Sequence, residues 1–381
     1  MKGMTPPLKG ITVLEFAQYL SGPCAGLRLA DLGARVIKIE QPLKGESGRK
    51  LAIKNMWVDE SSLLFHTINR NKESFAADLN DPEDMCCLRA LIQQAQVLLH
   101  NFRPGVMERK GLGYREVAAI NPSIIYTHIT GYGKQGKWAK KPGQDLLIQA
   151  MSGLAYTTGS ASHNPTPLGL GIGDYLCGNQ AVQFILAALI RSGKTGKGAL
   201  LELSLLESLI DFQFEFLTTY FNGGRLPSRS GVDNAHALLS APYGIYKTTD
   251  GYIAIAMMPL RQLNMALQCG ALDAFDETEA FARRDEIKSV IAAHISAKDT
   301  AYWLDRAGPL DLWIAPVLNW RQMKEKNGYK ILDMEQEVEL NSGRTFITTR
   351  CPIRIDRRKL YCNKPAPSPG QDTGTIKNSL L

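Results

Sequence analysis

The stretch ITVLEFAQYLSGPCAGLRLADLGARVIKIE (residues 11–40) decides the fold of this chain. Its apolar run 11–16 predicts a β-strand that ends at polar and glycine-rich residues, and the run 35–40 predicts a second strand. Between them, apolar side chains recur at helical spacing over residues 22–33, and Gly33 is a suitable residue to end a helix. The stretch therefore predicts a β-α-β unit.

The same alternation continues through the first half of the chain. Residues 74–79 predict a third strand, followed by Asp81, which can cap a helix, and Pro82, which the first helical turn accepts. Further strands are predicted at 97–102 and 123–129. Repeated β-α-β units with apolar strands indicate a parallel sheet covered on both faces. We therefore predict an α/β protein whose large domain is Rossmann-like and doubly wound.

The second half of the chain has a different pattern. Residues from about 175 to 220 are predicted to be mostly helical, and 221–231 have the glycine, proline and serine content of a linker. Residues 241–257 predict a hairpin with Asp250-Gly251 at its turn. Helices are expected around 261–268, 284–294 and 298–306. The tail from about 335 contains short strand-like pieces (EVEL, TFITT and IRID) and is expected to return to the large domain.

A chain of 381 residues exceeds the size of one compact core, so two domains are expected. The assigned segments are a large Rossmann-like domain over residues 1–200, a helical linker over 201–230, a small α+β domain over 231–325, and a return segment over 326–381.

Composition indicates a globular cytoplasmic protein. Lys and Arg number 44 against 37 Asp and Glu, which favours anionic partners, although no basic block interleaved with aromatics suggests nucleic acid. The seven cysteines are scattered without zinc spacing and are expected to be free thiols. The beginning of the chain lacks the apolar segment of a secretory signal. The apolar run 181–190 is too short for a membrane span.

The segment PLGLGIGDYLCG (167–178) carries the main candidate for chemistry. Its glycines allow a ligand to approach the backbone closely, and Asp174 stands before a long apolar helix. Aspartate at such a place is most often a helix cap. A carboxylate there can also act as a nucleophile, because backbone N–H groups nearby can stabilise an oxyanion. The residues alone leave both interpretations open.

Other segments are candidates for ligand binding. The loop 17–23 follows the first strand, where such folds bind ligands, but it lacks the G-x-G-x-x-G fingerprint of dinucleotide sites. Asn101 and Arg109 follow the fourth strand and suit a nucleotide phosphate or adenine, or simply a turn with solvated charge. The lysine-rich tract 134–145 suits a phosphate or a solvated surface. The six histidines show no metal-binding spacing, so no metal is expected.

Taken together, these motifs resemble the class III CoA-transferases, the family that includes formyl-CoA:oxalate and carnitine CoA-transferases. The resemblance runs through nearly the whole chain, from the stretch at 8–42 through INRNKESFAADL, LLHNFRPGVMERKGLGY and GIGDYLCG to APYGIYKTTDGYIAI. It implies a CoA-transferase that moves coenzyme A from an acyl-CoA to a free carboxylate. It also implies an interlocked homodimer, in which each chain is a ring threaded through the other.

The resemblance implies roles for individual residues. Asp174 matches the nucleophile that forms an aspartyl-CoA intermediate, Asp145 matches an acidic neighbour, and the backbone at Gly171–Gly173 would hold the oxyanion. Contacts with coenzyme A are expected from Tyr19, Leu20, Ser21, Lys72, Asn101, Phe102, Arg109 and the entrance lysines Lys140 and Lys141. No ATP or metal would be needed, because the thioester's energy is conserved.

Two departures from the family pattern affect the acyl pocket. Gln144 stands where these transferases often have tyrosine, and residues 253–263 contain no counterpart of the oxalate enzyme's glycine-rich flap. An oxalate substrate is therefore less expected than other small or dicarboxylic acids.

Three different functions compete with CoA transfer. An α-methylacyl-CoA racemase is the nearest of them, yet Gln144 stands where that enzyme has its catalytic histidine, and glutamine cannot serve as the base. A non-catalytic CoA-binding protein is the second. A nicotinamide dehydrogenase would suit the fold alone, but the missing dinucleotide fingerprint weighs against it.

Overall fold

The computed structural model describes residues 5–380, which form two compact units. The first unit holds the chain up to Ile148, Leu170–Asp211 and the chain from Asp333 on; the second holds Gln149–Gly169 and Phe212–Leu332. Residues 149–169, which the sequence places in the large domain, thus group with the second unit. The domain boundaries at 200, 230 and 325 stay predictions.

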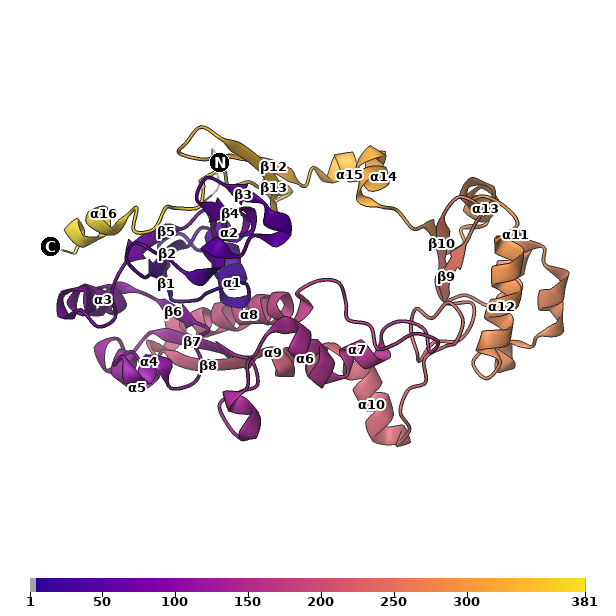
Figure 1. Ribbon diagram of the computed structural model, residues 1–381, viewed down its shortest axis with the longest axis horizontal. Helices are drawn as coiled ribbons and strands as arrows, with labels where there is room; N and C mark the ends of the chain where they lie inside the picture. Colours follow the sequence, from indigo (N-terminus) through magenta and orange to yellow (C-terminus); the bar gives the residue numbers. More distant parts are fainter. Residues whose placement is uncertain (1–4, 381) are drawn as a thin grey trace. The chain divides into compact units, whose positions relative to one another are not determined.

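Within the described chain, the first unit is built on a six-stranded parallel sheet (Figure 1). Its strands are β1 (Thr12–Glu15), β2 (Arg35–Glu40), β5 (Glu73–Ala76), β6 (Val97–His100), β7 (Ile125–Thr130) and β8 (Ala199–Ser204). They lie in the order β5-β2-β1-β6-β7-β8, which is the order of a doubly wound sheet. The order reverses between β1 and β6, and such folds bind ligands beyond the carboxyl ends of the strands at that point. The five strands predicted in the first half of the chain are confirmed.

Residues 175–220 are mostly helical, as predicted, but strand β8 is an exception that the sequence did not indicate. The segment ALLELS forms an edge strand that pairs in parallel with β7 along its whole length. Alanine, leucine and glutamate are good helix formers, so local preference favours a helix there. Pairing with β7 overrides that preference, because the sheet satisfies the backbone hydrogen bonds of the segment.

Helices cover both faces of the sheet (Figure 1). On one face lie α1 (Ser21–Asp31) and α8 (Ile172–Thr195), which pack against each other and against the strands. The other face is covered by α3 (Pro82–Gln94), α4 (Val106–Arg109), α5 (Tyr114–Ile120) and α16 (Thr373–Asn378), which bury an apolar core against β1, β2, β6 and β7. The remaining elements of this part are η1 (Ser47–Lys50), η2 (Ile53–Asn55), β3 (Trp57–Val58), β4 (Ser61–Ser62), α2 (Leu63–Asn69), η3 (Lys137–Lys140), α6 (Asp145–Ser152) and α9 (Leu205–Phe212).

Local signals in the sequence set the ends of two helices. The carboxylate of Asp81 accepts hydrogen bonds from the N–H groups of Glu83 and Asp84, both at 2.9 Å, and Pro82 opens α3. Gly33 follows the end of α1 with a φ of +98°, a conformation that glycine adopts without strain. Both predictions are confirmed.

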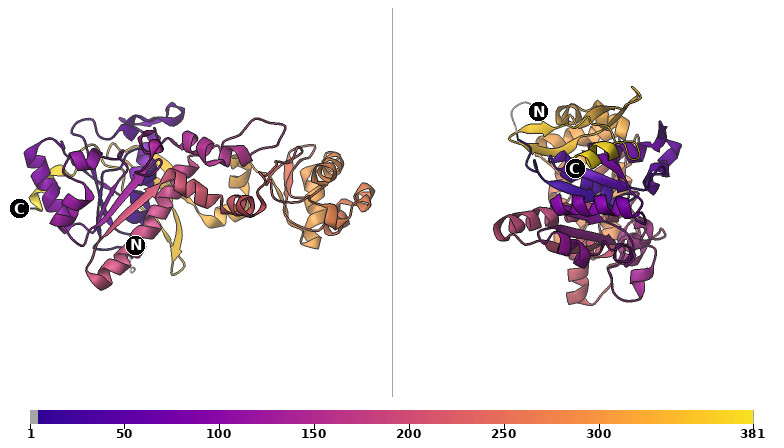
Figure 2. Two further views of the ribbon diagram at one scale, coloured as in Figure 1. Left: turned by 90° about the horizontal axis from the view of Figure 1, so that it is seen from below. Right: turned by 90° about the vertical axis from the view of Figure 1, so that its left-hand side faces the viewer.

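The tail packs beside the sheet. It forms two antiparallel pairs, β12 (Glu335–Glu339) with β13 (Thr345–Thr349) and β14 (Cys351–Ile355) with β15 (Arg358–Leu360). The N–H of Ser74 in β5 donates to the Asp372 carboxylate at 2.8 Å, and the N–H of Asn71 donates to the carbonyl of Lys364 at 2.9 Å. In Figures 1 and 2 the yellow C-terminal segment accordingly runs beside the indigo strands. The predicted tail strands are confirmed.

The second unit contains a three-stranded antiparallel sheet in the order β11-β10-β9 among its described residues. Its elements are α7 (Leu154–Thr157), α10 (Phe214–Gly223), β9 (Gly244–Lys247), β10 (Tyr252–Ile255), α11 (Leu260–Leu267), η4 (Gly270–Ala274), η5 (Glu277–Glu279), α12 (Arg284–Ile295), α13 (Thr300–Ala307), η6 (Gly308–Leu310), β11 (Ile314–Pro316), α14 (Trp320–Glu325) and α15 (Asn327–Leu332). The predicted hairpin and three helices are confirmed. Tyr246, Ile253, Leu263, Ile291 and Trp303 form part of its buried core.

Candidate active site

Asp174 lies in the first turn of α8, as its third residue. Gly171 occupies the N-cap position and has no side chain that could cap the helix. The interpretation of Asp174 as the helix cap is therefore wrong. Its carboxylate has other neighbours.

Ser21 is one of those neighbours. It is the first residue of α1, and its hydroxyl and backbone N–H face the Asp174 carboxylate and act to lower its pKa. The close approach of α1 and α8 depends on Gly178, because a Cβ at that position would lie 2.6 Å from the Ser21 carbonyl oxygen. The Asp174 carboxylate thus sits at the N-terminus of a second helix, where unpaired N–H groups and the helix dipole stabilise negative charge.

Asp145 is the second carboxylate of the site. It opens α6, and its Oδ1 accepts hydrogen bonds from the N–H groups of Gly173 at 2.7 Å and of Asp174 at 3.2 Å. A Cβ on Gly173 would lie 3.1 Å from the same oxygen, so glycine allows this contact. The structure therefore brings together the three predicted catalytic residues, Asp174, Asp145 and Gly173.

The environment changes the acidity of the candidate nucleophile. Burial and the charge of Asp145 raise the pKa of Asp174 to about 6, although the Ser21 hydroxyl and N–H oppose the rise. At pH 7 the group is still mostly a carboxylate, and its basicity is higher than that of an ordinary aspartate. Both properties suit a nucleophile.

The backbone donors expected to hold an oxyanion already have partners. The N–H of Gly173 binds Asp145, and the N–H of Ile172 donates to the carbonyl of Leu170 at 2.9 Å. An oxyanion at Gly173 would have to replace the Asp145 oxygen. The oxyanion role of this backbone stays a prediction.

The loop after β1 lies against the site. Tyr19 has a φ of +64°, and its side chain is 50% exposed. Leu20 reaches the N-terminus of α8, because a Cβ on Gly171 would lie 3.0 Å from the Leu20 Cδ2. Together with Ser21, these residues place the predicted coenzyme A loop beside Asp174.

Lys72 lies in the protein interior, whereas a residue that contacts a ligand is expected at an accessible position. Its side chain is fully buried, and its Nζ lies 2.8 Å from Glu15 Oε2 and donates to the Pro23 carbonyl and to Asn69 Oδ1, both at 2.9 Å. Burial lowers the pKa of Lys72 to about 8, against the charge of Glu15, which raises it. The amine supports the core beneath α1, and its contact with coenzyme A stays a prediction.

The residues after β6 fall into two groups. Asn101 binds the backbone of Gln18 in the loop after β1, and Phe102 is partly buried against the apolar core. Arg109, at the end of α4, is exposed, and so are Lys140 and Lys141 beside η3. The exposed cations are accessible to a phosphate, although no contact in the described part of the chain brings them to Asp174.

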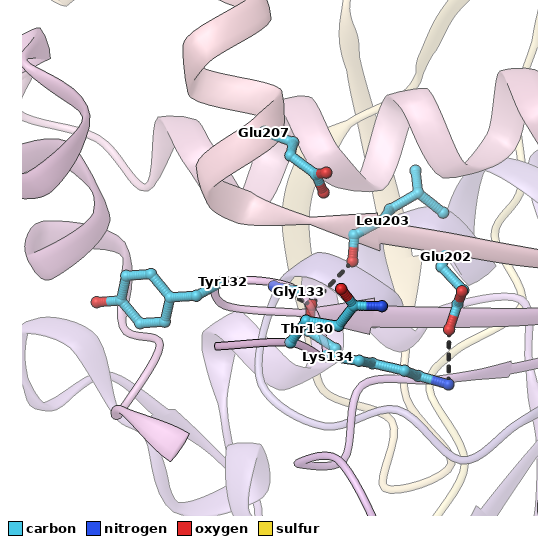
Figure 3. A pocket seen from close by; sticks show the side chains of 8 residues that line it. Thr130, Tyr132, Gly133, Lys134, Glu202, Leu203 and Glu207 are labelled. Atoms are coloured by element: carbon cyan, nitrogen blue, oxygen red, sulfur yellow. Dashed lines mark hydrogen bonds and ion pairs between the residues drawn. The ribbon is translucent and has the colours of Figure 1, made fainter. Parts of the chain in front are cut away.

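A pocket of about 290 Å³ opens at the carboxyl ends of β7 and β8 (Figure 3). It is lined by Thr130, Tyr132, Gly133, Lys134, Gln135, Glu202, Leu203 and Glu207. In Figure 3 Lys134 extends to Glu202, with an Nζ to Oε1 distance of 2.8 Å. Asp174 is not among the lining residues, so this pocket does not support its predicted role as the nucleophile.

A buried charged network next to the loop was not predicted from the sequence. Lys38 lies 2.9 Å from Glu15 and 3.7 Å from Glu46, and none of the three side chains is more than 3% exposed. Glu40 accepts from Arg49 at 2.6 Å in the same region. The sequence did contain an indication of this network. Glu15 and Lys38 lie within the predicted apolar strands 11–16 and 35–40, and charged residues at buried strand positions must be paired.

Metal-binding and membrane-spanning features are both absent from residues 5–380. No group of three or more His, Cys, Asp or Glu side chains there is arranged to hold a metal ion. Over the same residues, no helix combines the length and the apolar character needed to cross a bilayer.

These features define an α/β protein with a carboxylate site at the carboxyl edge of a doubly wound sheet, a class that is typical of enzymes. The model of CoA-transferase family III matches residues 8–373, and the chain belongs to this family. It is therefore an enzyme, a CoA-transferase, and coenzyme A is part of its substrate. The resemblance found in the sequence is confirmed.

Relatives and solved structures agree with this assignment. The chain is 32% identical to the succinate–glutarate CoA-transferase of Agrobacterium fabrum, over 100% of this chain and 97% of the relative. It is 33% identical to the succinyl-CoA:glutarate CoA-transferase of Mus musculus, over 98% of this chain and 86% of the relative. The crystal structure of a CAIB/BAIF family protein from Brucella suis matches with a TM-score of 0.85 at 28% identity, over 99% of this chain and 100% of that one.

Proposed function

We propose that this enzyme moves coenzyme A from an acyl-CoA thioester to a free small or dicarboxylic acid through an aspartyl-CoA intermediate on Asp174. The observation that carries the proposal is the position of the Asp174 carboxylate. It is partly buried, close to Ser21 at the N-terminus of α1 and adjacent to Asp145. The names of the relatives, which act on succinate and glutarate, support a dicarboxylic substrate.

The proposed reaction proceeds by exchange at two carbonyl groups. An oxygen of Asp174 attacks the thioester carbonyl, the carbon–sulfur bond breaks, and a mixed anhydride forms with release of the CoA thiolate. The thiolate then attacks the Asp174 carbonyl, which releases the first acid and leaves an enzyme thioester. The acceptor carboxylate attacks this thioester, and the same two steps run in reverse to give the new acyl-CoA and the free Asp174 carboxylate. Each step keeps an activated acyl group, so no other energy source is consumed.

The surroundings of Asp174 suit the charge changes in this sequence. Its carboxylate becomes a neutral ester-like group in the anhydride and in the thioester. Because Asp145 and burial raise the free energy of the charged form, its neutralisation is favoured. The Ser21 N–H and hydroxyl, which face the carboxylate, are then available to the oxygen that develops charge during each attack.

Coenzyme A is proposed to bind along the carboxyl edge of the sheet. The backbone of Tyr19, Leu20 and Ser21 and the ring of Phe102 would contact it near the thioester and the adenine. The exposed Arg109, Lys140 and Lys141 would meet its phosphates, because mobile surface cations attract such groups. We also propose a cytoplasmic, interlocked homodimer, as the resemblance implies; sedimentation as a monomer at micromolar concentration would contradict the dimer.

A racemase would require a base that removes an α-proton. Gln144, the exposed residue before Asp145, cannot accept that proton. Incubation of a 2-methylacyl-CoA with the enzyme in deuterated water should therefore give no deuterium incorporation at the α-carbon. Exchange at a rate comparable to CoA transfer would favour the racemase.

Mass spectrometry of the trapped intermediate tests the proposal. The enzyme is incubated with succinyl-CoA without acceptor and digested, and a coenzyme A adduct is expected on the peptide that carries Asp174. Asp174→Asn should abolish both the adduct and transfer to glutarate. Asp211→Asn, which removes an exposed carboxylate that accepts from Gln180 of α8, is the control and should keep both. Transfer without any modification of Asp174 would overturn the mechanism, and absence of turnover over a panel of acyl-CoA donors and acids would favour a non-catalytic CoA-binding protein.

A further inference from the structure

The loop that follows β1 is bound from the β6 side by one amide side chain. Asn101 Oδ1 accepts from the N–H of Gln18 at 2.8 Å, and Asn101 Nδ2 donates to the carbonyl of Gln18 at 2.7 Å. These two bonds connect the ends of β1 and β6, the neighbouring strands between which the strand order reverses. The same Nδ2 lies 3.5 Å from Ser21 Oγ. The amide group is therefore used by the protein's own backbone.

From the β2 side, buried charges bind the residues on either side of Gln18. Lys38 Nζ donates to the carbonyl of Ala17 at 2.8 Å and is held by Glu15 at 2.9 Å. Glu46 Oε2 accepts from the N–H of Tyr19 at 3.1 Å. The Lys38 side chain is completely buried, so this clamp is part of the interior.

The conformation of Tyr19 requires such a clamp. Its φ of +64° places a residue with a large side chain in the left-handed region, which costs about 1–3 kcal/mol and persists where the surrounding structure over-determines it. Three consecutive residues, Ala17 to Tyr19, have backbone groups bound by the side chains of Lys38, Asn101 and Glu46. The turn at Tyr19 in turn sets where α1 begins.

Because α1 begins at Ser21 and packs on α8 at Gly178, the clamp determines the position of the Ser21 hydroxyl and N–H that face Asp174. We propose that Asn101 and Lys38 are positioning residues, which hold residues 17–21 in the conformation that brings Ser21 onto Asp174. They act through Ser21, and no hydrogen bond or ion pair found among the described residues joins either of them to the Asp174 carboxylate. The proposal rests on the proposed function only in that Asp174 is the reacting group.

The charge state of Asp174 gives a direct readout, because the Ser21 hydroxyl and N–H favour the ionised form. The other groups that face this carboxylate are Asp145 and the thiols of Cys24 and Cys177. Burial raises the pKa of both thiols to about 12, so they stay protonated through the acidic and neutral range. A shift in the titration of Asp174 therefore reports on Ser21 and Asp145.

The test is a titration of the Asp174 carboxyl by carbon-detected NMR of protein labelled at the aspartate Cγ, with the signal assigned by its loss in Asp174→Asn. Ser21→Ala should raise the pKa of Asp174 by about one unit. Asn101→Ala should raise it in the same direction, and the near-isosteric Asn101→Leu, which loses both hydrogen bonds to Gln18 without adding a charge, should do the same. In a double-mutant cycle, Asn101→Ala should shift the pKa by less on the Ser21→Ala background than in the unmutated protein, because only the Ser21 N–H is left to be displaced.

Gln96→Ala is the matched control. Its amide also connects to β1, since Gln96 Oε1 accepts from the N–H of Thr12 at 2.8 Å, but at the opposite end of that strand. It should leave the Asp174 titration unchanged. An unchanged titration in both folded Asn101→Ala and folded Asn101→Leu, or shifts that add in full in the double mutant, would overturn the positioning role. The NMR measurement needs no turnover, so its result is independent of the adduct experiment. If the pKa shifts appear as expected but no coenzyme A adduct forms, Asp174 is not the nucleophile, and the positioning role of Asn101 and Lys38 still holds.

Discussion

Lys72 and Glu15 form an ion pair of 2.8 Å in which both side chains are fully buried. Glu15 shares its other oxygen with Lys38 at 2.9 Å. A Cβ on Gly26 would lie 1.7 Å from Glu15 Oε2, so α1 passes directly over this pair. The relationship makes Lys72 a structural support of the helix that carries Ser21.

Replacement of Lys72 by methionine should destabilise the protein by about 2–4 kcal/mol, because it leaves one oxygen of a buried carboxylate without its cation. The midpoint of urea unfolding at pH 7.5 measures the effect. Lys377→Met is the control: its ion pair with Asp84 spans 3.0 Å but is partly exposed, so the cost should stay below about 1 kcal/mol. Equal costs in the two variants, with a rise in the KM for acyl-CoA in Lys72→Met, would instead favour a direct contact with coenzyme A.

The rate of CoA transfer should fall at acidic pH with an apparent pKa near 6. The nucleophile must be ionised, and burial together with Asp145 raises the pKa of Asp174 to about 6. This decrease is measured as the pH dependence of kcat/KM with a saturating acceptor. Below pH 5, kcat/KM should fall about ten-fold per pH unit. If kcat/KM stayed constant down to pH 4, Asp174 would either titrate like an exposed aspartate or take no part in the reaction.

Asp174→Asn should make the protein more stable at neutral pH. The folded-state pKa is about 6 and the unfolded value about 3.9, so the neutral carboxyl favours folding below pH 4, and this contribution is lost as the pH rises through 6. An uncharged amide avoids that loss and should add roughly 1–3 kcal/mol at pH 7.5, with the gain shrinking toward pH 4. Urea unfolding of both proteins at several pH values measures it. Asp211→Asn should show no such pH-dependent gain.

Much of the large unit could be predicted because its signals are local. The strands at 11–16 and 35–40 are continuous apolar runs, and Asp81 and Gly33 act within a few residues of themselves. Strand β8 could not be recognised in this way. Its alanine, leucine and glutamate residues fit a helix as well as an edge strand, and pairing with β7, about seventy residues earlier, decides between them.

In the candidate site, too, local features could be predicted from the sequence and long-range contacts could not. Asp174 was identifiable from its glycine-rich segment, but its link to Asp145 joins residues 29 apart, and its link to Ser21 joins residues of two helices. The buried pairing of Glu15 with Lys38 depends on neighbouring strands. The spacing of residues in one sequence does not predict such contacts, because they form only when the sheet and its covering helices have assembled.

Gly178→Ala should separate the two helices that carry the site, and it can be compared with a glycine of the same helix that has open space around it. An alanine Cβ at 178 would lie 2.6 Å from the backbone oxygen of Ser21, so α1 and α8 must move apart. We expect a loss of about 1–3 kcal/mol in stability and at least a ten-fold loss in transfer rate, because the Ser21 donors move away from Asp174. Gly193→Ala, also within α8, meets nothing within 4 Å among the described residues and should stabilise the protein by about 0.5–1 kcal/mol without loss of rate. Urea unfolding and initial rates with succinyl-CoA and glutarate measure both variants. If Gly178→Ala were as harmless as Gly193→Ala, close packing of α1 on α8 would not be what holds Ser21 against the nucleophile.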